Sequence, residues 1–166
     1  MIHLYTGDGG GKTTAALGVA MRALGHDKKV VMVQFMKGRT DIGEYKIQDK
    51  LENFKVYQFG RKDFIKPVDM PANKDKELAK QCLEFVKKIL EEKPDILILD
   101  EINLAVAVNL LDVKEVVEVL KGKPKSVHVL MTGRFAPKEF KKLADIVTIV
   151  EDEKRVERAA QEGIEY

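Results

Sequence analysis

Short apolar runs recur along the chain, and most of them are separated by segments with a helical pattern of hydrophobic positions. Residues 96–99 are apolar at every position, as expected for a strand that is buried on both faces of a parallel sheet. The alternation of strands with helices predicts a parallel sheet with right-handed crossovers and helices on both faces. The predicted strands are residues 2–5, 30–35, 54–59, 96–99, 127–131 and 146–150.

Helices are predicted from apolar stripes and from signals for helix ends. Residues 13–24 carry one stripe, and Gly25 is the expected C-cap. A second stripe covers residues 78–90 and ends before a proline. Asp112, followed three residues later by a glutamate, opens a third helix as a variant of the capping box, and Pro137 opens a fourth.

Composition narrows the class of protein. A chain of 166 residues is about one domain long, and 45% hydrophobic with 34% charged residues is typical of a globular domain over residues 1–166. With 29 basic and 27 acidic residues, the net charge of +2 argues against general binding to nucleic acid or to a membrane surface. No apolar run approaches the roughly 20 residues of a bilayer helix, and Met1 opens no signal peptide, so we expect a cytoplasmic protein. The single cysteine, Cys82, excludes an intrachain disulfide and is predicted to pack in the core.

The strongest chemical signal is a glycine-rich segment between the first predicted strand and the first predicted helix. Its backbone N–H groups can converge on phosphate oxygens, with added positive potential from the helix N-terminus. Lys12 would neutralise charge, and the Thr13 hydroxyl can bind Mg²⁺. The predicted fold class is therefore α/β, a P-loop NTPase-like (RecA-like) domain with a mostly parallel sheet and helices on both faces. We call this segment the phosphate loop; its predicted ligand-binding residues are Thr6, Gly7, Asp8, Gly9, Gly10, Gly11, Lys12, Thr13 and Thr14.

The phosphate loop is one residue shorter than the usual pattern. Gly7 and Gly11 are separated by three residues, whereas the common motif has four residues between its first glycine and the Gly-Lys pair. A shorter loop wraps the phosphates differently. The γ-phosphate need not lie where a kinase holds it, and the chemistry can take place elsewhere on ATP.

Acidic and basic residues follow two other predicted strands. Asp100 and Glu101 end the apolar strand 96–99, and the carboxyl ends of parallel strands face one crevice. One of these carboxylates is expected to bind Mg²⁺ directly or through water. Glu101 would polarise water in a hydrolase or bind the metal in a transferase. Arg134, after strand 127–131, would contact phosphate or form a structural salt bridge.

Several blocks, in order over nearly the whole chain, resemble the CobA/BtuR-type ATP:corrinoid adenosyltransferases. The short phosphate loop is shared with that family, and the combination of blocks is more specific than the loop alone. The resembling blocks are residues 7–16, 22–26, 34–38, 43–44, 99–103, 132–134, 136–137, 144–148 and 163–166.

This resemblance implies transfer of the 5′-deoxyadenosyl group of ATP to cobalt(I) of a reduced corrinoid, with release of tripolyphosphate. Because cobalt(I) is the nucleophile, no side-chain base is needed. Lys12, Glu101 and Arg134 are the predicted catalytic residues, and Thr13, Asp100 and Glu101 the predicted Mg²⁺ ligands. The resemblance also implies a homodimer, a flavoprotein reductant, and nucleotide or corrinoid contacts from Arg22 and Lys37.

The polar segment 37–73, interrupted by glycines and prolines, is predicted to form ligand-facing loops. In the resembling family an apolar wall displaces the lower ligand of cobalt, and we place this wall at Phe64, with Phe59 as the second choice. The chain departs from the family in having no tryptophan near that position, where Lys66 stands. Many members of that family carry an arm before the first strand, whereas here we expect the first strand directly after Met1, and residues 152–155 replace a Lys-His-Pro-like block.

Two alternative functions remain open at the level of sequence. A P-loop NTPase or kinase would act at the γ-phosphate, with Glu101 orienting water or a hydroxyl. A non-catalytic module would bind a corrinoid in an ATP-dependent manner without chemistry. The products formed from ATP distinguish these functions.

Overall fold

The structure is a computed structural model that describes residues 1–61, 72–156 and 159–165. Within these residues, strands form one sheet in the order β3-β2-β4-β5-β1-β6, and every pairing is parallel. The predicted fold class is confirmed, and each predicted strand is present to within a residue at either end. The strands are β1 (Ile2–Thr6), β2 (Val30–Phe35), β3 (Phe54–Phe59), β4 (Ile96–Asp100), β5 (His128–Met131) and β6 (Ile146–Ile149).

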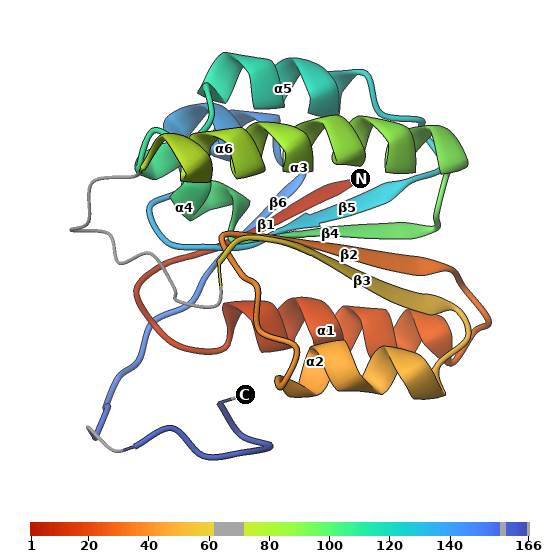
Figure 1. Cartoon of the computed structure of the whole chain (residues 1–166), viewed down its shortest axis with the longest axis vertical. Helices are drawn as coiled ribbons and strands as arrows, with labels where there is room; N and C mark the ends of the chain where they lie inside the picture. Colours follow the sequence, from red (N-terminus) through yellow and green to blue (C-terminus); the bar gives the residue numbers. More distant parts are fainter. Residues whose placement is uncertain (62–71, 157–158, 166) are drawn as a thin grey trace.

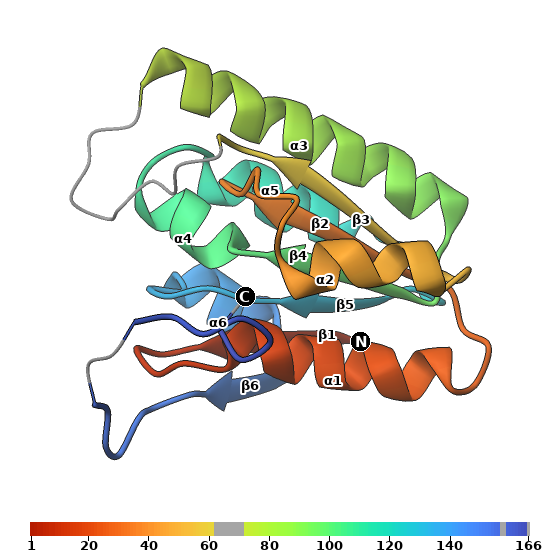
Figure 2. The same cartoon turned by 60° about the horizontal axis from the view of Figure 1, so that its bottom comes forward.

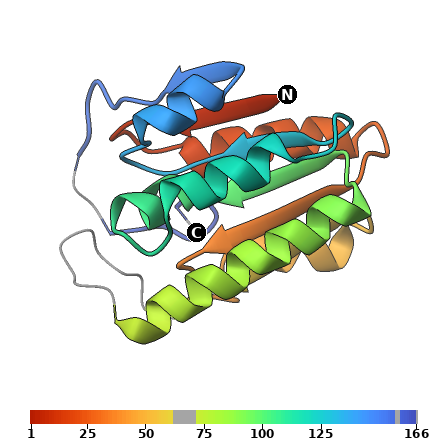
Figure 3. The same ribbon diagram turned by 90° about the horizontal axis from the view of Figure 1, so that it is seen from above.

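Helices cover both faces of the sheet. In Figure 1, α3, α4, α5 and α6 lie on one face, and α1 and α2 lie on the other. The view from above in Figure 3 shows α3 and α5 lying over the sheet, roughly along the direction of its strands. The helices are α1 (Lys12–Leu24), α2 (Gly43–Lys46), α3 (Asn73–Glu92), α4 (Ile102–Ala107), α5 (Val113–Lys121) and α6 (Lys138–Leu143), with a 3₁₀ helix, η1 (Ile47–Lys50), after α2.

The four predicted helices are present, but α2, η1 and α4 were not predicted. The interpretation of residues 37–73 as loops was therefore too simple, because α2 and η1 lie within that segment in addition to β3. Each of the three is six residues or fewer, too short for an apolar stripe to emerge from the sequence. At α5, the Asp112 side chain accepts from the Lys114 N–H at 2.7 Å as an N-cap, without the full capping box.

Alternate side chains of the strands build two cores. Val33, Leu97 and Met131 pack toward α3, α4, α5 and α6, whereas Met32 and Ile98 pack toward α1 and α2. The continuously apolar strand is thus buried on both faces, as the sequence predicted. Among the described residues, no helix is long and apolar enough to cross a bilayer.

The fold brings three strand ends together at one edge of the sheet. β5 lies between β1, which leads into the phosphate loop, and β4, which ends in Asp100. The segment after β6 passes beside the phosphate loop (Figure 2), where the Gly9 N–H donates to the Val150 carbonyl at 2.9 Å. Residues far apart in the sequence therefore meet at the carboxyl end of the sheet.

Candidate nucleotide-binding site

The phosphate loop depends on glycine at both of its ends. Gly7 and Gly11 have φ angles of 110° and 93°, in the region that side chains other than glycine rarely adopt. A Cβ on Gly7 would also lie 2.3 Å from the Val150 carbonyl oxygen. The loop therefore rests against the chain after β6 and turns directly into α1 at Lys12.

Lys12 is buried beside the loop, with 7% of its surface exposed, and its Nζ donates to the Gly9 carbonyl. Burial lowers the pKa of Lys12, and the positive charge of Arg134 lowers it further, while Glu101 and Asp8 act in the opposite direction. The ammonium group is held in a partly desolvated position, where an anionic ligand gains more from it than it would in water.

Asp100 is fully buried, and each of its two carboxylate oxygens accepts two hydrogen bonds. Oδ1 accepts from the hydroxyls of Thr13 at 2.8 Å and Thr132 at 2.7 Å. Oδ2 accepts from Lys37 Nζ at 2.7 Å and Gln34 Nε2 at 3.0 Å. Because the Thr13 hydroxyl is one of these four donors, Asp100 fixes the orientation of the Thr13 side chain. The four hydrogen bonds also compensate the buried negative charge of Asp100.

The charges of Asp100 and Lys37 stabilise each other. Burial alone would raise the pKa of Asp100, but the Lys37 ammonium and the hydroxyl donors outweigh it and hold the pKa below its usual value. Burial alone would likewise lower the pKa of Lys37, whereas Asp100 raises it. The pair is therefore ionised at neutral pH.

Glu101 follows Asp100 in a left-handed conformation, with φ at 62°, and its N–H donates to the Thr132 hydroxyl at 3.1 Å. Its Oε2 atom is buried and accepts no hydrogen bond from the described residues. Burial, and then the negative charge of Asp100, raise the pKa of Glu101 to about 7, although Lys37, Lys12 and Arg134 oppose the shift. The negative charge of the ionised Glu101 side chain is therefore only partly balanced by its surroundings, and the group can bind a cation.

The raised pKa of Glu101 predicts a pH-dependent stability. Between the ordinary pKa of 4.5 and about 7, the folded state holds a proton that the unfolded state releases, so stability falls as pH rises. Without ligand, we expect Glu101→Gln to be about 2 kcal/mol more stable than the wild type at pH 8, and nearly equal to it at pH 5. Urea unfolding at both pH values measures this. Glu91→Gln, on exposed α3 surface, is the control, and a Glu101→Gln difference that is independent of pH would contradict the assignment.

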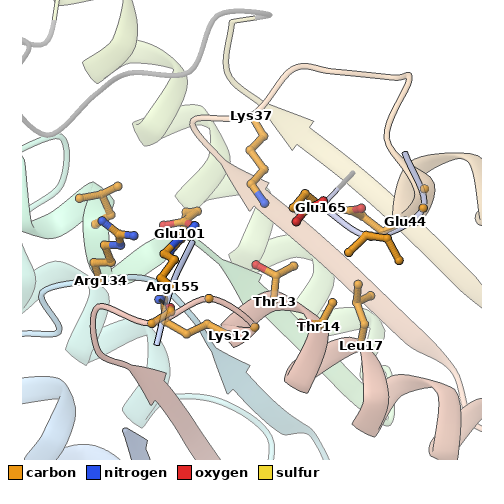
Figure 4. Close-up of a pocket in the computed structure, with 17 residues that line it drawn as sticks. Lys12, Thr13, Thr14, Leu17, Lys37, Glu44, Glu101, Arg134, Arg155 and Glu165 are labelled. Carbon is orange, nitrogen blue, oxygen red and sulfur yellow. Dashed lines mark hydrogen bonds between the residues drawn. The ribbon is translucent and has the colours of Figure 1, made fainter. Parts of the chain in front are cut away.

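These groups line a cavity of about 660 Å³ at the end of the sheet. Figure 4 shows Lys12, Glu101 and Arg134 at one side of this cavity, with Thr13 and Lys37 along it. The predicted residues that line it are Gly9, Gly10, Gly11, Lys12, Thr13, Thr14, Lys37, Glu101 and Arg134. Sequence reasoning had not assigned roles to the others, which are Leu17, Gly43, Glu44, Leu104, Arg155, Gly163, Ile164 and Glu165.

The remaining predicted residues lie elsewhere. Asp100 is behind Thr13, and Thr6 is buried, with its hydroxyl accepting from the Ala136 N–H at 3.2 Å. Arg22 is in the last turn of α1, away from the cavity lining, and Phe64 lies outside the described residues. Phe59 packs against Phe85 with ring centroids 5.2 Å apart and does not line the cavity; the other predicted residues outside the lining are Gly7 and Asp8.

The site fits a cation that is bound jointly with phosphate. No group of three or more His, Cys, Asp or Glu side chains that could hold a metal alone occurs among the described residues. The Thr13 hydroxyl and the Glu101 carboxylate, with its unpartnered oxygen, are nevertheless close to the loop. Mg²⁺ in nucleotide sites is commonly held by one or two protein oxygens together with phosphate oxygens and water.

A glycine loop between a strand and a helix, followed by a buried lysine and a threonine bound to a strand-end aspartate, defines a P-loop nucleotide-binding protein. Residues 1–166 match the family described as ATP:corrinoid adenosyltransferase BtuR/CobO/CobP. The chain belongs to this family and is an enzyme that transfers the adenosyl group of ATP to corrinoid cobalt, as the resemblance implied.

Full-length similarity to curated proteins supports the same conclusion. The corrinoid adenosyltransferase of Escherichia coli K12 is 36% identical over 173 residues, covering 100% of this chain and 85% of that protein. The corrinoid adenosyltransferase CobA of Salmonella typhimurium LT2 is 35% identical over 174 residues, covering 100% and 85%. The Sinorhizobium sp. corrinoid adenosyltransferase is 34% identical over 173 residues, covering 100% and 80%.

Proposed function

We propose that residues 1–166 act as a single cytoplasmic domain that transfers the 5′-deoxyadenosyl group of ATP to cobalt(I) of a reduced corrinoid. An electron pair of cobalt forms the bond to C5′ and formally oxidises cobalt(I) to cobalt(III). The bond from C5′ to the α-phosphate oxygen breaks, and its electron pair leaves with that oxygen. The complete triphosphate is therefore the leaving group.

One observation carries the proposal: the cationic groups of the cavity gather around the phosphate loop. Lys12 and Arg134 line the same cavity as Gly9, Gly10 and Gly11 of the loop. Negative charge grows on the triphosphate as it departs from C5′. Cationic groups fixed beside the phosphate loop therefore stabilise the transition state more than the ground state. With cobalt as the nucleophile, the chain needs to orient C5′ and stabilise the leaving group.

The residues around Thr13 are suited to hold Mg²⁺ with the triphosphate. We assign the Thr13 hydroxyl and Glu101 carboxylate as its protein ligands and Asp100 as the residue that acts through Thr13. Bound there, Mg²⁺ would neutralise part of the triphosphate charge. Lys37 keeps Asp100 ionised and thereby keeps Thr13 oriented.

Four further predictions rest on the family resemblance alone. Two concern ligand contacts, namely an apolar wall at Phe64 and a nucleotide or corrinoid contact from Arg22. The other two are a homodimer and a flavoprotein reductant. Replacement of Phe64 by alanine is the direct way to examine the first of them.

The products of ATP test the proposed reaction. With Mg²⁺ and a chemically reduced corrinoid, we expect tripolyphosphate and the cobalt–carbon bond to form in equal amounts, measured by ion chromatography and by the corrinoid absorption spectrum. ADP with orthophosphate as the only products would favour the P-loop hydrolase or kinase. Binding of an adenosyl-corrinoid without turnover would favour the non-catalytic module.

A further inference from the structure

A fourth cationic side chain, Arg155, lines the cavity together with Lys12, Lys37 and Arg134 (Figure 4). It comes from the chain after β6, in the block where the sequence departs from the family pattern and where no catalytic role was predicted. Its side chain is 61% exposed, so its guanidinium group is accessible to a ligand that enters the cavity.

Asp152 connects Arg155 to the phosphate loop. Its Oδ2 atom accepts from Arg155 Nη1 at 3.1 Å, and its Oδ1 atom accepts from the Gly10 N–H at 3.0 Å. The Asp152 carboxylate therefore bridges a loop amide and the arginine.

Close backbone packing fixes the position of this bridge. A Cβ on Gly9 would lie 2.7 Å from the Glu151 carbonyl carbon and 2.8 Å from the Asp152 nitrogen. The Val150 N–H donates to the Thr6 carbonyl at 2.7 Å, which continues the β1–β6 pairing up to the loop. Because the backbone at residues 150–152 packs against the loop, Asp152 lies beside the loop. The hydrogen bond from Arg155 to Asp152 then keeps Arg155 close to the cavity.

We propose that Arg155 is a further triphosphate-binding residue and that Asp152 is the positioning residue that keeps it beside the phosphate loop. Guanidinium donors match phosphate oxygens in geometry and charge, and the cavity already presents Lys12 and Arg134 to the same ligand. This inference rests on the proposed function, because it assumes that the polyphosphate lies along the loop.

Binding measurements by isothermal titration calorimetry test the role of Arg155. We expect Arg155→Ala to weaken binding of Mg-ATP and of tripolyphosphate about tenfold, and to leave adenosine binding unchanged. Arg155→Lys should restore part of the loss. The matched control is Lys154→Ala, which removes the same charge from the neighbouring exposed position and should change affinity less than about twofold.

Equal effects of Arg155→Ala and Lys154→Ala would overturn the role of Arg155, since only general electrostatics would then remain. The role of Asp152 is tested by a double-mutant cycle. In the Asp152→Ala background, Arg155→Ala should cost clearly less affinity than in the wild type, and additive effects would overturn the positioning role. If the wild-type protein fails to bind Mg-ATP, the proposed function fails instead.

Discussion

Lys12→Ala is expected to reduce adenosyl transfer by about 10³-fold, the range seen when a single preorganised charge-stabilising group is removed. Lys12 is buried at the start of α1 and is the cation closest in sequence to the glycine loop. Its loss removes positive charge where the departing triphosphate becomes more negative. Steady-state formation of the cobalt–carbon bond, with saturating ATP and reduced corrinoid, measures the effect.

The fold should tolerate Lys12→Ala. The hydrogen bond that its side chain makes is to the Gly9 carbonyl, and burial lowers its pKa, so its removal relieves a desolvated charge. Thermal unfolding should therefore stay close to that of the wild type. Lys80→Ala, on exposed α3 surface, is the control and should retain full activity. Near-normal turnover by a correctly folded Lys12→Ala protein would remove the phosphate-loop mechanism.

Asp100→Asn is expected to lower the free energy of unfolding by about 3 kcal/mol, because it removes the buried carboxylate that pairs with the partly buried Lys37 ammonium. The new amide also presents its own N–H groups to some of the four donors that Asp100 accepts. Thr13 would lose its fixed orientation, so activity should fall together with stability. Urea unfolding monitored by circular dichroism measures the first effect.

Two further variants separate the ion pair from the rest of the network. Asp95→Asn, at the start of the same β-strand segment and half-exposed, should cost less than about 1 kcal/mol. Lys37→Met combined with Asp100→Asn should recover part of the stability lost by Asp100→Asn, since it removes the unpaired ammonium. A loss below 1 kcal/mol for Asp100→Asn, or strict additivity in the double variant, would contradict the described network.

The sheet was predictable because each of its strands is rich in apolar residues, and in β4 they are continuous up to Leu99. β2 and β3 were placed at their observed ends, and a polar residue, Lys29 or Asn53, directly precedes each of them. The short helix α4 was not predictable in the same way. It follows β4 after one residue, and its apolar residues face a core that only the complete fold creates.

Part of the site was also predictable, because several of its residues are close together in the sequence. Lys12 and Thr13 follow the glycines directly, and Asp100 ends an unmistakably buried strand, so neighbouring positions in the sequence are neighbours in space. Arg155 and Glu44 carry no such signal, because they reach the cavity by tertiary packing of distant segments. The ion pair of Lys37 with Asp100 also spans 63 residues, and no local pattern encodes it.

The bond that breaks in ATP tests the central claim most directly. ATP that carries ¹⁸O in the bridge between C5′ and the α-phosphorus should be converted with a reduced corrinoid and Mg²⁺. The account predicts that all of this label appears in a terminal phosphate group of the released tripolyphosphate, detected as an isotope shift by ³¹P NMR. Label retained between C5′ and phosphorus in ADP, with orthophosphate as the second product, would contradict it.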